Sequence, residues 1–222
     1  MAAKESWRVL LLGLAIFTMA GCAAHRIAIA EKFGYAKREQ LVDRVQDARD
    51  GQVAAKEQFQ SALKQFLAVT NVSGTELQDL ETKYDKLQSE YDHCESRAEE
   101  VRDRIARVQQ VAEALFNEWR EELKQYTNEN LRRSSSRQLE DTRRKYDRLI
   151  DVMKVAESRM TPVLSAFKDQ VLYLKHNLNA RAISSLQQNA DQIQSDVTKL
   201  VRQMESSIKE ANTFIEQMQA SK

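Results

Sequence analysis

The sequence predicts an all-α fold, an elongated antiparallel bundle whose helices pack like those of a coiled coil. Turn residues are scarce, because the five glycines all lie before residue 75 and Pro162 is the only proline among 222 residues. β-Sheets and the loops of enzymes need such residues roughly every 8–12 positions. Apolar residues also recur at alternating steps of three and four over long stretches, which is the repeat of supercoiled helices.

Four apolar seams of this kind follow one another along the chain. They extend over Leu41–Val69, Leu77–Trp119, Tyr146–Phe167 and Ile183–Ala211. Each seam must be buried against other helices, and the segments between the seams are short. We therefore expect four long helices that fold back on one another in antiparallel order.

The first two boundaries between the helices are marked by polar residues. Asn71–Thr75 has the composition of a turn, and Ser73 followed by Glu76 has the spacing of a capping box that opens the second helix. The second break is predicted at Thr127–Ser136, where asparagines and serines replace the seam.

The third boundary is less distinct. Two asparagines in His176–Asn179 indicate a turn, while Pro162 lies within the third seam. A proline there either kinks a long helix or sits in the first turn of a new one. The alternative fold is therefore a three-helix bundle in which residues 137–219 form one rod kinked at Pro162.

One segment of the third helix is apolar on every side. Val171–Leu174 has no polar face, which predicts burial on several sides in the centre of the bundle. An interface with a second subunit or another partner is the alternative interpretation.

The N-terminus predicts a bacterial lipoprotein signal peptide, residues 1–21. Lys4 and Arg8 flank an apolar run, Val9–Met19, which is too short to cross about 30 Å of hydrocarbon. Met19–Cys22 resembles a lipobox, so we expect cleavage before Cys22 and acyl chains, palmitate among them, on that cysteine. An ordinary secretory signal that leaves Cys22 as a free thiol is the alternative.

The residue after the cysteine predicts the destination. In Gram-negative lipoproteins an aspartate there usually retains the protein in the inner membrane, and this chain has Ala23. The resemblance implies the periplasmic face of the outer membrane. Residues 22–30 would then be a lipidated tether, and residues 31–222 a single elongated helical-bundle domain.

Charge argues against nucleic acid as a partner. Lys4, Arg8 and Glu5 fall within residues 1–21, so the remaining chain has as many basic as acidic side chains. A chain without net charge has little general electrostatic attraction for nucleic acid or for an anionic membrane.

No motif predicts catalysis, a metal or a cofactor. The sequence has no glycine-rich phosphate-binding loop, and His25, His93 and His176 are far apart. We therefore predict a non-enzyme without a small-molecule substrate. Cys94 falls on the second seam, where it is expected to be a buried small hydrophobe. A redox or metal role together with His93 is the alternative.

One stretch has a local excess of arginine and is the candidate partner surface. It combines Arg132, Arg133, Arg137, Arg143, Arg144 and Arg148. Arginine suits bidentate binding of anionic groups. A hydrated helix face with intrahelical ion pairs is the alternative interpretation.

Several stretches together carry a family resemblance. They are Glu31–Glu39, Leu41–Asp50, Ala112–Trp119, Leu131–Leu139 and Leu174–Ile183. The chain resembles an uncharacterised family of proteobacterial all-helical lipoproteins, known only as a domain of unknown function. The resemblance implies a helical protein of the cell envelope and carries over no catalytic residue.

These observations predict a periplasmic helical scaffold or adaptor that binds another envelope protein or a second copy of itself. A regulator of a cell-wall hydrolase or synthase is one alternative. A bundle that binds lipid at the membrane surface is another.

Overall fold

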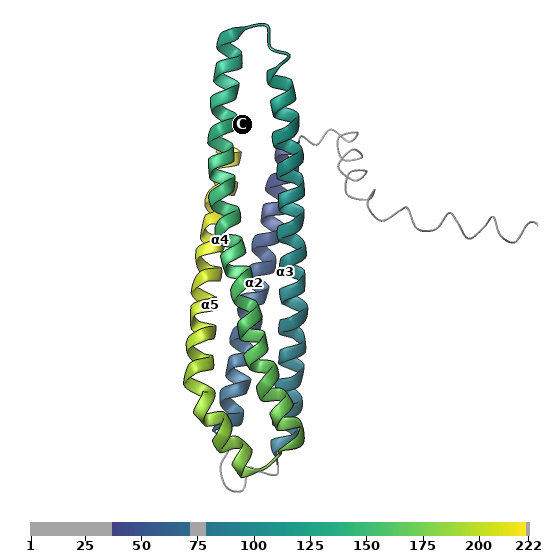
Figure 1. The fold of residues 1–222 in the computed structure, drawn as a ribbon, viewed down its shortest axis with the longest axis vertical. Coiled ribbons are helices and arrows are strands. Elements are labelled where there is room, and N and C mark those ends of the chain that lie inside the picture. Colours follow the sequence, from purple (N-terminus) through teal and green to yellow (C-terminus); the bar gives the residue numbers. More distant parts are fainter. Residues whose placement is uncertain (1–36, 72–78, 221–222) are drawn as a thin grey trace, which may run out of the picture.

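The computed structural model describes residues 37–71 and 79–220, which form four long helices and no strand (Figure 1). The helices are α2 (Lys37–Thr70), α3 (Leu80–Leu123), α4 (Glu129–His176) and α5 (Ala180–Ala220). The all-α class is confirmed. The four-helix version of the fold is also confirmed, because the chain turns at residues 177–179 and Pro162 lies inside α4.

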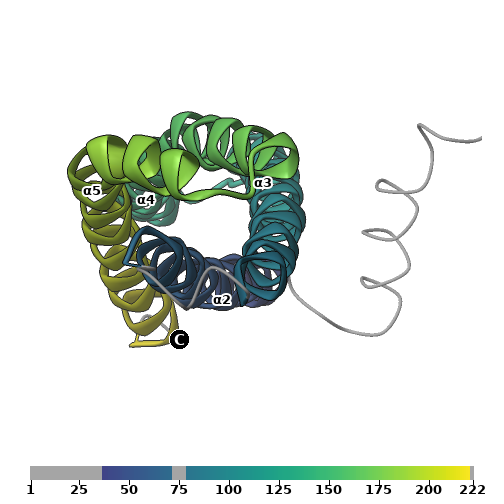
Figure 2. The same cartoon turned by 90° about the horizontal axis from the view of Figure 1, so that it is seen from below.

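The helices form a closed antiparallel ring. Each helix packs against its neighbours in sequence, and α5 returns to pack against α2 (Figure 2). No described helix has a stretch that is apolar and long enough to cross a membrane. Every helix instead buries one stripe and exposes the rest, as amphipathic helices do in a four-helix bundle.

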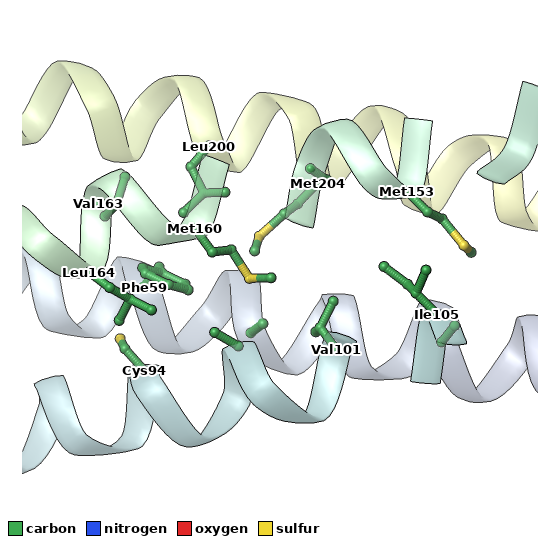
Figure 3. Close-up of a cluster of buried hydrophobic side chains, with 14 of the residues drawn as sticks. Phe59, Cys94, Val101, Ile105, Met153, Met160, Val163, Leu164, Leu200 and Met204 are labelled. Atoms are coloured by element: carbon green, nitrogen blue, oxygen red, sulfur yellow. The ribbon is translucent and has the colours of Figure 1, made fainter. Parts of the chain in front are cut away.

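The core follows the predicted seams closely. Every position of the first and third seams is buried. In the second seam Tyr84 and Trp119 are only partly buried, and Leu77 lies outside the described residues. In the fourth seam Ser207, rather than Ile208, occupies the core position. Figure 3 shows the centre of this core, where methionine side chains of α4 and α5 point toward α2 and α3.

The predicted break at Thr127–Ser136 is wrong in its position. The helix α3 ends at Leu123, and Asn128 already caps α4 by accepting hydrogen bonds from the backbone N–H groups of Asn130 and Leu131. The cap satisfies amides that would otherwise be unpaired, so the serines that follow lie within the helix. The predicted Ser73 capping box falls outside the described residues, and α3 begins at Leu80 after Asp79.

The expectation for Val171–Leu174 is also wrong. Val171 and Leu174 are buried, but Leu172 and Tyr173 are 49% and 39% exposed. The helix α4 packs mainly against α3 and α5, so only one stripe of it is covered and the other side faces outward.

The two ends of the bundle differ. At one end lie the start of α2, the end of α5 and the α3–α4 turn, and there α3 and α4 extend past the other two helices (Figure 1). At the opposite end lie the α4–α5 turn and the end of α2. The first is called the near end below, because the chain enters α2 there, and the second is called the far end.

Candidate functional site

The described residues contain no candidate metal site. Within residues 37–71 and 79–220, no three histidine, cysteine or acidic side chains lie close enough to hold a metal ion. The two carboxylates with a lowered pKa, Glu100 and Asp196, are surface groups. Hydrogen bonds from Arg97 and Arg104 lower the pKa of Glu100, and bonds from Gln192 and Lys199 lower that of Asp196.

Cys94 is buried, as its place in the seam predicts. Figure 3 shows it pointing from α3 into the core, at the level of Phe59 and Leu164. Burial raises the pKa of the Cys94 thiol to about 12, and the charge of Glu90 adds to this effect. His93, the adjacent residue, is exposed, so the helix does not bring the imidazole and the thiol together.

The candidate arginine surface lies along the first half of α4, with all six side chains exposed. Most of these arginines have partners within the bundle. Arg132 pairs with Glu129 at 2.8 Å, Arg144 pairs with Asp141, and Arg133 donates to the side-chain oxygen of Asn130 at 3.0 Å.

Two more of the arginines, Arg143 and Arg148, reach the next turn or another helix, and Arg137 is exposed on the same face. Arg148 lies 3.9 Å from Glu210 of α5, Arg143 lies 4.0 Å from Asp147, and the guanidinium of Arg143 covers the ring of Phe116 at 5.4 Å. These contacts favour a hydrated helix face for this stretch. Its role as a partner surface stays a prediction.

A different surface signal comes from exposed apolar side chains. Among the described residues, six large hydrophobic side chains are exposed, and five of them lie at the two ends of the bundle. Tyr126 and Leu131 flank the α3–α4 turn at the near end. Leu172, Tyr173 and Leu178 surround the α4–α5 turn at the far end, and only Val155 lies midway along α4.

The name far-end cluster is used for Leu172, Tyr173 and Leu178. Leu172, Tyr173 and Leu178 are 49%, 39% and 41% exposed. Asn177 closes the helix there, since its side-chain amide donates to the Tyr173 carbonyl at 2.9 Å and its backbone N–H to the Leu174 carbonyl at 3.0 Å. Leu172 and Tyr173 are therefore held on a capped helix end, and Leu178 lies two residues beyond it. Apolar groups gathered in this way mark contact sites for other molecules.

Part of this exposed apolar surface could be recognised in the sequence. The apolar Val171–Leu174 segment stood out, with an interface as the alternative interpretation, whereas Tyr126 and Leu131 gave no such warning. Cys22, the predicted lipidation site, lies outside the described residues.

One comparison with known proteins gives a match. Residues 27–218 match the model of a family described as Protein of unknown function (DUF2959). No curated protein and no solved structure is significantly similar to the chain.

Proposed function

We propose a function from this chain's own residues, because the chain belongs to the DUF2959 family and that family has no assigned activity. The protein is a lipid-anchored spacer of the Gram-negative periplasm that binds another envelope protein at its far end. One observation carries the proposal: the chain enters the bundle at one end, and the cluster of Leu172, Tyr173 and Leu178 lies at the other.

The anchor belongs to the near end. Lys37 begins α2 there, and Cys22 precedes it by only fifteen residues. Acyl chains on Cys22, following the signal-peptide pattern of residues 1–21, would hold this end at the membrane. Ala23 favours the outer membrane over the inner one.

The long sides of the bundle, called the shaft, set the distance between its near end and its far end. The 48 residues of α4 extend over about 70 Å at 1.5 Å per residue. The far-end cluster is therefore displaced from the membrane by the length of the bundle. A rod with a closed core and few exposed apolar groups along its sides suits a spacer that acts through its ends.

The partner is expected to be a protein with an apolar groove. Leu172 and Tyr173 are large side chains on one helix end, and aromatic and aliphatic anchors of this kind dominate protein–protein binding energy. Lys175 and His176 lie beside them in the last turn of α4 and supply a polar rim.

Site-specific photo-crosslinking in cells tests the proposal. A photoreactive amino acid at position 172 or 173 of the full-length protein should give one or two defined adducts. The matched control is position 155, since Val155 is equally exposed at 44% but lies midway along the shaft. Adducts of the same identity and yield from all three positions, or none from the far end, would contradict the proposal.

The identity of the adduct distinguishes the forms of the proposal. A cell-wall hydrolase or synthase would make the protein its regulator, and a second copy of the chain would make the far end a homo-oligomer contact. Fractionation tests the anchor separately, because Cys22→Ala should release the protein from the outer membrane.

A further inference from the structure

The near end carries a projecting helical hairpin. Lys37 at the start of α2 forms a 3.0 Å ion pair with Glu118 of α3, which fixes the level at which α2 begins. On the other side, Arg148 of α4 lies 3.9 Å from Glu210 of α5, and α5 ends ten residues later at Ala220. Residues 118–138, which lie beyond these levels, are called the overhang.

The overhang rises well above the other helices. In α4 its residues 129–138 form nearly three helical turns, about 15 Å in length. Figure 1 shows this pair of helices standing alone above the ends of α2 and α5.

Specific contacts hold the two arms of the overhang together. Trp119 of α3 donates from its indole nitrogen to the hydroxyl of Ser135 of α4 at 2.8 Å. Trp119 and Leu123 are partly buried against the core. Asn128 caps the second arm. The hairpin is therefore a built element, and its tip exposes Tyr126 and Leu131 at 41% and 57%.

The length of chain before Lys37 indicates what lies above this tip. Fourteen residues connect Cys22 to Lys37, and even fully extended they reach only about 50 Å. From the level of Lys37 to the far end, residues 138–176 of α4 extend over about 57 Å, so the tether is too short to reach the far end. A bundle that stands upright on the membrane attached to Cys22 therefore has its near end toward that membrane. The overhang is the part of the described structure that projects farthest in that direction.

We infer that the overhang is a membrane foot: the bilayer interface covers Tyr126 and Leu131 and seats the lipid-anchored bundle upright. The inference rests on the proposed function, since it takes the anchor on Cys22 as given. It adds that the tip itself enters the headgroup region, so that the far end points away from the membrane.

The chemistry of the tip fits a lipid surface. Tyrosine is enriched at membrane interfaces, where its ring is buried and its hydroxyl remains hydrated. Leu131 supplies an aliphatic side chain beside it, and Arg132 and Arg133 follow within reach of lipid phosphates.

Net charge does not drive this contact. Basic and acidic side chains nearly balance within residues 118–138. Two apolar side chains alone would bind a bilayer weakly from solution. The lipid anchor, however, makes docking of the tip an intramolecular event with a high effective concentration. A weak affinity of the tip for the bilayer is then enough to keep it docked.

The test attaches the lipid chemically, so that it does not depend on acylation in cells or on a partner. A maleimide-bearing lipid couples to Cys22 of the chain 22–222 on phosphatidylcholine vesicles. Cys94 is buried and its pKa is raised, so it does not compete. Trp119 is the only tryptophan after residue 21, so Trp119→Phe gives a background for single-tryptophan probes. Because this change removes the hydrogen bond to Ser135, slow hydrogen exchange at residues 129–138 must first show that the overhang is still formed.

Two probes in that background report on the two ends. Tyr126→Trp places the indole at the tip, and Tyr173→Trp places it at the far end as the matched control. With lipids brominated near the headgroup, the tip probe should lose roughly half of its emission, because an interfacial group lies about 5–10 Å deep, and the far-end probe should lose none. Adding Leu131→Ser to the tip probe should reduce the quenching.

Three results would overturn the inference. Equal quenching of both probes would show a bundle lying flat on the membrane. An unquenched tip probe on a protein that floats with the vesicles would show that the tip stays in water. Disulfide capture between two copies carrying Leu131→Cys, together with an unquenched tip, would show that a second copy covers the tip.

Discussion

The hydroxyl of Ser207 in α5 donates a 2.7 Å hydrogen bond to the side-chain oxygen of Gln52 in α2, with both residues completely buried. The amide nitrogen of Gln52 is buried as well and has no hydrogen-bond partner among the described residues. A polar pair of this kind costs desolvation energy and is tolerated only while its members face each other.

We therefore expect a non-additive effect of substitutions in this pair. Ser207→Ala alone leaves the Gln52 oxygen unpaired and should lower the free energy of unfolding by about 1–3 kcal/mol. Combining it with Gln52→Met, which keeps the shape of the side chain, should restore the stability of the parent or exceed it. Urea unfolding followed by circular dichroism measures both; a double variant weaker than Ser207→Ala would contradict the prediction.

A second prediction concerns the crossing of α2 and α3. A Cβ atom at Gly51 would lie 2.8 Å from Cδ of Arg104, whose guanidinium donates to the Asp47 carbonyl at 2.6 Å and pairs with Glu100. In the Arg104→Ala background, Gly51→Ala should raise the free energy of unfolding by about 1 kcal/mol, the helix-propensity difference between the two residues. In the parent the gain should be smaller or reversed, because Arg104 must move. Equal gains in both backgrounds, measured by the same unfolding titration, would refute the steric explanation.

Alkaline pH should destabilise the bundle. Burial raises the pKa of Cys94, Tyr91 and Tyr146 to about 12 each, from ordinary values of 9.0 for the thiol and 10.0 for the phenols. Between pH 9 and 12 the unfolded chain loses these protons while the folded chain keeps them, so stability falls as pH rises. The measurement is the thermal midpoint from pH 7 to 11.

A triple variant provides the control for this pH dependence. Cys94→Ala, Tyr91→Phe and Tyr146→Phe remove the three groups, and the decline above pH 9 should become shallower. Lysine titration is common to both proteins and cancels in the difference. Parallel curves for parent and variant would show that these groups do not carry the effect.

The cap of α4 should matter for the overhang. Asn128 accepts from the N–H groups of Asn130 and Leu131 at 2.9 and 3.2 Å, so Asn128→Ala should cost about 1 kcal/mol of helix stability. Hydrogen exchange should accelerate at the amides of Asn130 and Leu131 but not in the middle of the bundle. Asn128→Asp is the matched control, because its carboxylate can cap the helix and should keep exchange slow.

The heptad pattern made the core largely predictable. A residue on a seam that alternates steps of three and four must face the bundle axis, and the third seam, Tyr146–Phe167, is buried at every position. Cys94 is buried for the same reason.

The choice between Ser207 and Ile208 could not be read in this way. Steps of three and of four from Met204 are both compatible with a heptad, and Gln52, a residue 155 positions away, faces the serine. The overhang could not be predicted either, because the lengths of the helices do not determine their offset along the bundle axis. That offset depends on contacts between helices, such as the pair of Lys37 and Glu118.

The start of α2 and the end of α5 are neighbours, since Arg38 donates to the Met218 carbonyl at 3.1 Å. A circular permutant can therefore join Ala220 to Lys37 by a short linker and open the chain between Asn71 and Asp79. Giving its new N-terminus a lipidated cysteine would turn the same bundle upside down on the bilayer, with every side chain of the rod retained. Comparing this inverted protein with the parent would show whether the function depends on which end of the rod faces the membrane or only on the side chains of its surface.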